Sequence, residues 1–180
     1  MKTLSTARST LQWSGEPTTI LGIDPGSRKM GYGVVELLPR SGYVYRECGV
    51  ITANVKAPLH ERLVELGEGL TSLLSEYDIA FAAVEDIFVG MNIQSAFVLG
   101  QARGMVLYLL GTKGIDITAY APTLVKKYIG GSGRAPKDQV RRSVSLLTGL
   151  TTLPAEDAAD ALALAVCHAM HLRLSLKGVP

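Results

Sequence analysis

Apolar residues change their spacing along the chain, and these changes mark where predicted strands give way to helices. The run 18–24 (TTILGID) is short, apolar and rich in β-branched residues, and Pro25-Gly26 follows its last residue. It predicts a buried strand that enters a turn. Residues 31–38 follow within hairpin distance, and 43–53 form a third segment of this kind. The start of the chain therefore predicts an antiparallel meander of three strands.

Helical spacing begins at Pro58, a residue suited to the first turn of a helix. Leucine and valine then recur three or four positions apart up to residue 77, which predicts a helix over 58–77. Residues 79–85 (IAFAAVE) are almost continuously apolar, as expected of a strand buried on both faces. A long helix over 91–113 and a short strand over 115–120 are predicted next.

The last part of the chain is predicted to be helical. A helix over 122–129 leads into a glycine-rich hinge or lid at 130–133, and a basic helix follows from Pro136. The final helix, 157–174, is apolar around most of its circumference, so it must be largely buried. Three antiparallel strands, followed by two strands joined through helices, predict a mixed five-stranded sheet flanked by helices. This is the layout of the α/β ribonuclease H-like fold.

Length and composition favour a single domain. A chain of 180 residues with 47% hydrophobic residues can bury one compact core. We assign that domain to 19–175 and expect 1–18 to be a disordered extension. Charged or polar residues and glycines interrupt the apolar stretches before the roughly 18 residues that a membrane span needs, so no membrane association is expected. Cys48 and Cys167 are isolated, which favours a reducing compartment such as the cytoplasm.

Charge is unevenly distributed, although the formal net charge is only +2. The window 121–142 contains six cations and the single acid Asp138. Such a segment is either a solvated helical face or a stripe that binds phosphates. The cations are Lys126, Lys127, Arg134, Lys137, Arg141 and Arg142.

Four carboxylates stand where a ligand would be expected. Asp24 and Glu85 end the first and fourth predicted strands, at the edge where ligands of open α/β sheets gather. Asp157 and Asp160 are three positions apart, so they share one face in the first turn of the final helix. Singly, each acid has an ordinary explanation, such as an Asx turn or a favourable place near a helix N-terminus. Together they favour ligation of Mg²⁺, with Mn²⁺ as a substitute, because no cysteine or histidine converges with them.

This combination of residues suits hydrolysis of a phosphodiester. Two cations about 4 Å apart, bridged by a carboxylate, can activate a water and stabilise the leaving oxygen. Carboxylates alone would repel DNA, so the ions are expected to be obligatory and the basic window to hold the phosphates. Asp24 is the expected bridging ligand, and Glu85 and Asp160 complete the two cation sites.

Three segments resemble the signatures of the RuvC-type crossover-junction endodeoxyribonucleases: LGIDPGSRKMGYGVVE, AVEDIFVGMNIQSAFVLGQARG and EDAADALALAVCHA. The resemblance spans Ile20 to His168. It implies that the acids matching Asp24, Glu85, Asp157 and Asp160 bind divalent ions. It also implies a homodimer that nicks two strands of a four-way (Holliday) junction in recombination and repair, leaving 5′-phosphate and 3′-hydroxyl ends, together with a branch-migration motor of the RuvA and RuvB type.

The resemblance also assigns residues that contact DNA. Phe88 matches the aromatic residue that family members insert near the crossover, and Lys126 and Lys137 match lysines that contact DNA or assist near the scissile phosphate. A proline directly before Lys137 fixes the start of its helix and puts the reach of this lysine in question. The small-residue helix at 95–110 is either a dimer face or an intramolecular packing surface. The remaining candidates rest on local charge alone: Lys127, Arg134, Arg141 and Arg142.

Other functions fit these features less well. Actin-like ATPases and sugar kinases share the Asp-x-Gly-Ser turn, but they need two such domains to close on ATP. A module that binds junctions without cutting them would not need all four acids. A related nuclease of the same fold that acts on RNA or on other branched DNA stays open.

Overall fold

The computed structural model describes residues 13–86 and 93–176 of the chain, and its strands form one mixed sheet in the order β3-β2-β1-β4-β5. β1 pairs antiparallel with β2 and β2 with β3, whereas β4 runs parallel to both β1 and β5. The predicted sheet of five strands is confirmed. The strands are β1 (Thr18–Asp24), β2 (Lys29–Leu38), β3 (Gly42–Thr52), β4 (Ile79–Glu85) and β5 (Asp116–Tyr120).

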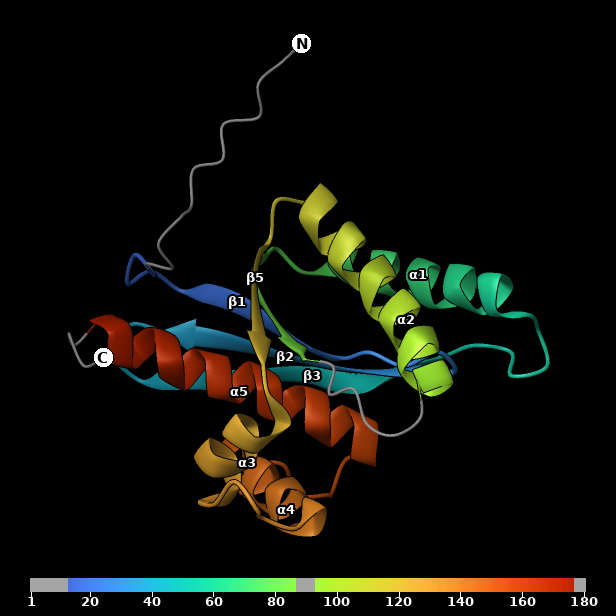
Figure 1. Ribbon diagram of the computed structural model, residues 1–180. Coiled ribbons are helices and arrows are strands. Elements are labelled where there is room, and N and C mark those ends of the chain that lie inside the picture. Colours follow the sequence, from blue (N-terminus) through green and yellow to red (C-terminus); the bar gives the residue numbers. More distant parts are fainter. Residues whose placement is uncertain (1–12, 87–92, 177–180) are drawn as a thin grey trace.

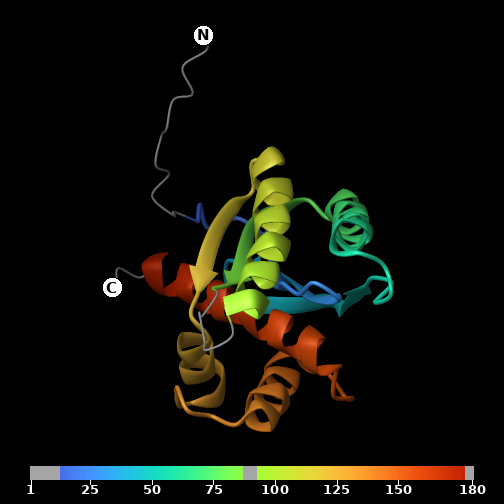
Figure 2. The same ribbon diagram turned by 45° about the vertical axis from the view of Figure 1, so that its right-hand side comes forward.

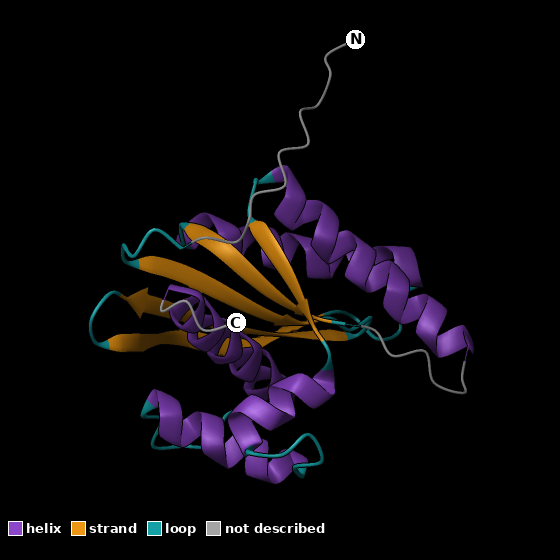
Figure 3. Ribbon diagram, turned by 60° about the vertical axis from the view of Figure 1, so that its left-hand side comes forward, coloured by secondary structure: helices purple, strands orange, loops and turns teal. Residues whose placement is uncertain are grey.

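Helices cover both faces of this sheet (Figure 1). α1 and α2 lie on one face, and α5 crosses the other face with α3 and α4 packed on its outer side, as Figure 2 also shows. Figure 3 shows the sheet between these two helical layers. The helices are α1 (Leu59–Glu76), α2 (Ile93–Thr112), α3 (Pro122–Gly130), α4 (Lys137–Thr148) and α5 (Glu156–Leu176).

The central strand β1 contributes to two separate hydrophobic cores, one on each face of the sheet. Ile20 packs in the core beneath α5, whereas Leu21 and Ile23 pack in the core beneath α1 and α2. Successive side chains of a strand point to opposite faces, so a strand covered on both sides must be apolar at nearly every position. This burial on both sides explains the apolar run from Ile20 to Ile23 in the sequence of β1.

α5 lies unusually close to the backbone of the sheet. A Cβ atom at Gly22 of β1 would come within 1.9 Å of the carbonyl oxygen of Ala161, and one at Gly33 of β2 within 2.5 Å of the Cα of Leu162. Real side chains do not fit at such distances, so glycine at these positions is what permits the approach. The close packing fixes the position of α5 against the strands, including the first turn that carries Asp157 and Asp160.

Two segments differ in detail from the prediction. Trp13 is buried in the core beneath α5, so the packed part of the chain begins before the predicted boundary at residue 18; residues 1–12 lie outside the described part. The predicted hinge at 130–133 forms an anchored turn. Gly131 ends α3 in the left-handed conformation (φ 78°), and the Gln139 amide donates a hydrogen bond of 2.7 Å to the Gly130 carbonyl.

α2 is unusual among the helices that the structure describes, because it alone is long and apolar enough to cross a membrane by length and composition. The core helix of a globular protein can have the same length and composition. α2 is nevertheless poorly covered, with only 17% of its apolar window buried. It exposes three large apolar side chains to solvent, those of Ile93, Phe97 and Tyr108.

Candidate active site

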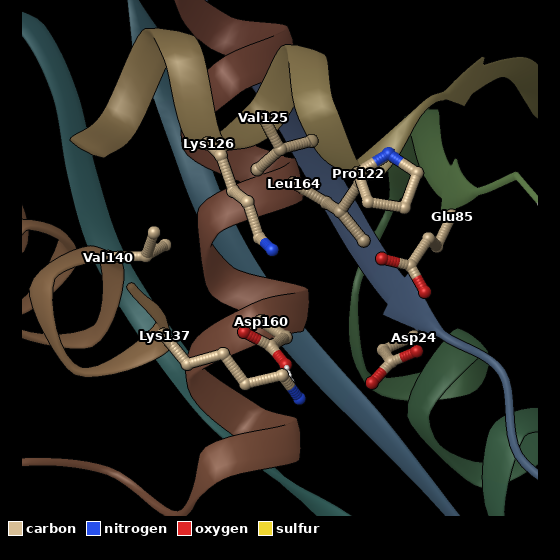
Figure 4. Close-up of a pocket in the computed structure, with 9 residues that line it drawn as sticks. All are labelled: Asp24, Glu85, Pro122, Val125, Lys126, Lys137, Val140, Asp160 and Leu164. Atoms are coloured by element: carbon tan, nitrogen blue, oxygen red, sulfur yellow. Dashed lines mark ion pairs between the residues drawn. The ribbon is translucent and has the colours of Figure 1, made fainter. Parts of the chain in front are cut away.

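Asp24 and Glu85 lie side by side at one edge of the sheet because they end two adjacent parallel strands. Ile23 of β1 pairs with Val84 of β4, so the following residues of both strands reach the same edge. Their carboxyl groups share a hydrogen bond. Asp160 approaches from the first turns of α5, and the three acids border one cavity of about 270 Å³ (Figure 4). The edge predicted from the sequence thus brings these three residues together.

Asp157 occupies a neighbouring position. It borders a second cavity, of about 210 Å³, together with Asp24 and the turn that joins β1 to β2. Its carboxylate forms an ion pair with Lys29, the first residue of β2. Asp24 therefore stands between the two cavities, with Glu85 and Asp160 on one side and Asp157 on the other.

Burial and mutual repulsion raise the pKa values of the central carboxyls. Burial is the largest cause for Asp24, and the negative charges of Glu85 and Asp160 add to it, which raises the pKa of Asp24 to about 8. Burial, followed by the charge of Asp160, raises the pKa of Glu85. Burial also raises the pKa of Asp160, against the opposing effect of Lys137. The site therefore holds more negative charge than its own cations compensate.

Two lysines face these acids from α3 and α4. Lys126 directs its side chain into the cavity, and Lys137 reaches it from the first residue of α4 (Figure 4). The Lys137 ammonium is 2.6 Å from the Glu156 carboxylate and 3.6 Å from that of Asp160. Pro136, the N-cap of α4, thus does not keep Lys137 away from the acids.

The other predicted DNA-contacting residues lie outside this cavity. Lys127, Arg134 and Arg142 are exposed on α3, the following turn and α4. Arg141 donates a hydrogen bond of 2.6 Å from Nε to the Pro154 carbonyl, so it holds the loop that leads into α5. Phe88 lies outside the described residues.

Sequence reasoning missed two cations beside the site. Lys29 pairs with Asp157, as described above. Arg103 of α2 donates a hydrogen bond of 3.1 Å to the carbonyl of Glu85, and its guanidinium is 3.4 Å from the Asp86 carboxylate. A single arginine within an otherwise apolar helix was the available signal for Arg103, since a cation in such a helix needs a polar partner.

The acids fit a hard divalent cation by their chemistry. Every candidate donor is a carboxylate oxygen, the type that Mg²⁺ and Mn²⁺ prefer, and the raised pKa of Asp24 reports negative charge that a cation would relieve. Within residues 13–86 and 93–176, however, no three acidic, histidine or cysteine side chains are already arranged around one ion position. Two of the acids are instead paired with lysines: Lys29 forms an ion pair with Asp157, and Lys137 with Asp160 as well as with Glu156.

Comparisons with known proteins agree with this geometry. The family model for "Crossover junction endodeoxyribonuclease RuvC" matches residues 20–168. The RuvC protein of Azorhizobium caulinodans is 46% identical over 152 residues, covering 84% of this chain and 89% of its own. That of Chloroflexus aggregans is 45% identical over 152 residues, covering 83% and 91%.

Solved structures lead to the same family. Thermus thermophilus RuvC in complex with Holliday junction substrate superimposes with a TM-score of 0.81 at 30% identity, over 88% of this chain and 96% of that one. The yeast mitochondrial resolvase Ydc2 has a TM-score of 0.60 at 14% identity over 91% and 86% of the two chains, and shares the fold. The predicted ribonuclease H-like architecture is confirmed. This chain belongs to the RuvC family of crossover junction endodeoxyribonucleases.

Proposed function

We propose that this chain resolves four-way DNA junctions by paired, metal-dependent hydrolytic nicks that leave 5′-phosphate and 3′-hydroxyl ends. The convergence of Asp24, Glu85 and Asp160 on one cavity, with Lys126 and Lys137 on its opposite wall, carries this proposal. Acids that bind cations and lysines that attract phosphates are the two components that a phosphodiesterase requires. The family relationship supplies the substrate, since a solved relative is described in complex with a Holliday junction.

The family is one of divalent-metal-dependent nucleases, and we assign the ligands of this chain to its four acids. Asp24 lies between the two cavities and is the candidate to bridge two Mg²⁺ ions, for which Mn²⁺ would substitute. Glu85 and Asp160 would complete the sites, and Asp157 would join after release from Lys29. When bound, the ions make water nucleophilic and stabilise the leaving oxygen.

The lysines of this chain would position the substrate. Lys126 projects its ammonium into the cavity, where it can pair with a phosphate oxygen. Lys137 already offsets the charge of Asp160 and would contact the same phosphate. Phe88 is assigned to stacking near the crossover by the family resemblance alone.

We further propose that the chain acts as a homodimer through α2. Its exposed residues Ile93, Phe97 and Tyr108 share one face with three glycines, because all six are spaced by three or four positions. Apart from the neighbouring residues and backbone of α2 itself, no described heavy atom lies within 4 Å of a Cβ built at any of these glycines, so the face is open to close approach. A two-fold dimer matches a substrate that is nicked symmetrically. The glycines are Gly100, Gly104 and Gly111.

A cytoplasmic location and cooperation with a branch-migration motor of the RuvA and RuvB type complete the proposal. Both rest on the family relationship. A reducing compartment also suits the free cysteines Cys48 and Cys167.

The decisive experiment incubates the protein with a mobile four-way junction, with and without Mg²⁺, beside a linear duplex and an RNA–DNA hybrid. We expect Mg²⁺-dependent, paired cuts in the junction only, with ends that a DNA ligase can rejoin. Equal cutting of junction and duplex would overturn the junction specificity. Preferential cutting of the hybrid would instead indicate a ribonuclease.

A further inference from the structure

A third cavity, of about 530 Å³, lies on the side of the active site away from the lysines of α3 and α4. The turn after β1 forms one wall, and α1 and the start of α2 form the others. Its polar lining comes from Arg28, Arg62, Gln94 and the Ser27 and Ser95 residues, and none of the described residues that line it is a carboxylate. By contrast, three carboxylates line the cavity that holds Asp24 and Glu85.

This cavity borders the active site across the turn between β1 and β2. Ser27 and Arg28 also line the cavity that contains Asp24 and Asp157, so the two spaces meet at the turn between β1 and β2. The carboxylates therefore have cations on both sides. Lys126 and Lys137 lie on the α5 face of the sheet, and the two arginines lie on the α1 and α2 face. A chain of phosphates that crosses the sheet edge would pass from one set of cations to the other.

The two arginines have donors to spare. Arg62 donates a hydrogen bond of 2.8 Å from Nη1 to the Ser27 carbonyl, which fixes its guanidinium beside the turn. Its Nε is buried without a hydrogen-bond partner in the described part of the chain. Arg28 is exposed, and neither arginine forms an ion pair with any acid that the structure describes. The guanidinium of Arg62 is thus held at the wall of the cavity, where it and the exposed Arg28 would donate to a phosphate oxygen.

We propose that Arg28 and Arg62 form a subsite that binds a backbone phosphate flanking the scissile one. Guanidinium groups bind phosphate through paired N–H donors, and two of them without a counterion favour an anion over a neutral sugar or base. The subsite would hold the cut strand across Asp24 from the side opposite to Lys126 and Lys137. It rests on the proposed function, because it requires DNA as the substrate.

Methylphosphonate interference tests this subsite. A mobile junction carries one neutral methylphosphonate at a time at the phosphates on each side of the scissile bond, and its affinity is measured in EDTA so that no cutting occurs. Removing one charged contact is expected to weaken binding of the wild-type protein about ten-fold at one flanking position. Arg28→Ala should bind the unmodified junction about ten-fold more weakly and lose its sensitivity at that same position. Arg28→Lys should recover part of the affinity.

A matched control separates a local contact from general charge. Arg40 is exposed in the turn between β2 and β3, at the opposite end of the sheet, so Arg40→Ala removes the same charge far from the cavity. It should leave both affinity and interference pattern unchanged. Arg62→Lys keeps the charge but loses the fixed guanidinium. It should reduce the methylphosphonate interference at the same phosphate position as Arg28→Ala.

The outcomes separate this inference from the function on which it rests. If wild-type protein cuts junctions selectively but Arg28→Ala keeps the full interference pattern, the subsite is wrong and the nuclease assignment stands. The subsite is equally wrong if Arg28→Ala and Arg40→Ala weaken binding to the same extent at all positions. If wild-type protein does not distinguish junction from duplex, the proposed function itself fails.

Discussion

Gly31 of β2 lies directly against the first turn of α5, where a Cβ atom at Gly31 would come within 2.0 Å of the carbonyl oxygen of Asp157. The turn of α5 that carries Asp157 and Asp160 therefore packs directly against the backbone of β2. Gly31→Ala must push α5 away from β2, which we expect to cost about 1–3 kcal/mol of unfolding free energy by overpacking. Because Asp157 and Asp160 move with the helix, cleavage should fall more steeply than junction binding. Thermal unfolding and single-turnover cleavage measure the two effects.

Gly67 provides the matched control for this substitution. It lies within α1, where an added Cβ would meet only flexible side chains, the nearest being Met105 at 3.4 Å. Alanine is favoured over glycine inside a helix, so Gly67→Ala should unfold at the same temperature or higher and cut normally. Loss of activity in Gly67→Ala would mean that the effect of Gly31→Ala is not specific to α5.

Asp24 is expected to reduce the stability of the fold because it is buried among other acids. Its pKa is raised from 3.8 to about 8, so between these values the folded protein binds a proton that the unfolded chain releases. Stability without divalent ions should therefore fall as pH rises through this window. Asp24→Asn removes this group, so its unfolding free energy should exceed that of the wild type at pH 8 and by a smaller margin at pH 5, since each pKa unit of the shift corresponds to about 1.4 kcal/mol.

Denaturant unfolding in EDTA at pH 5 and pH 8 measures this difference. Mg²⁺ should stabilise the wild type at pH 8 more than Asp24→Asn, because it binds the native carboxylates. The variant should bind junctions without cutting them. A variant that is less stable than the wild type at both pH values, and that binds no junction, would show that Asp24 has a structural role.

Lys126 and Lys127 are adjacent in sequence but differ in their surroundings, which makes them a paired test of the lysine assignments. Lys126 lines the carboxylate cavity, and Lys127 is exposed outside it. Lys126→Ala should lower the single-turnover cleavage rate at least ten-fold at saturating protein, whereas Lys127→Ala should change it less than two-fold, with only slightly weaker binding, because its charge is solvated. Equal effects of both substitutions would show that general positive charge matters, rather than a contact within the cavity.

The sequence was sufficient to predict the strands and helices because their patterns are set by burial. β1 is apolar from Ile20 to Ile23 and β4 from Ile79 to Val84 since both faces are covered, and the acid that follows each apolar run marks the same sheet edge. β2 begins at Lys29 rather than at 31, because its first residues pair with Ile51 and Thr52 of β3. Such pairing depends on the partner strand and is not visible in the local pattern.

Contacts between distant segments explain what the sequence could not predict. Nothing local distinguishes Lys29 from any surface lysine until β2 is placed under the first turn of α5, where it meets Asp157. Arg62 lies in a predicted helix with no sign that it would reach the Ser27 carbonyl across the turn after β1. The first 18 residues are rich in serine and threonine and have no clear amphipathic repeat, so they predict a disordered extension, yet Trp13 packs in the core.

Phe97 tests the proposed dimer, since this phenylalanine is 70% exposed on the open α2 face. Phe97→Asp should place an uncompensated charge in an apolar interface and shift the protein from dimer to monomer in sedimentation at micromolar concentration. A monomer can nick one strand at a time, so nicked junctions should accumulate in place of paired products. Leu146→Asp is the control, because Leu146 is 83% exposed on α4, away from α2, and should leave the dimer intact. A Phe97→Asp protein that stays dimeric and makes paired cuts would place the interface elsewhere, and α2 would then need another partner for its apolar face.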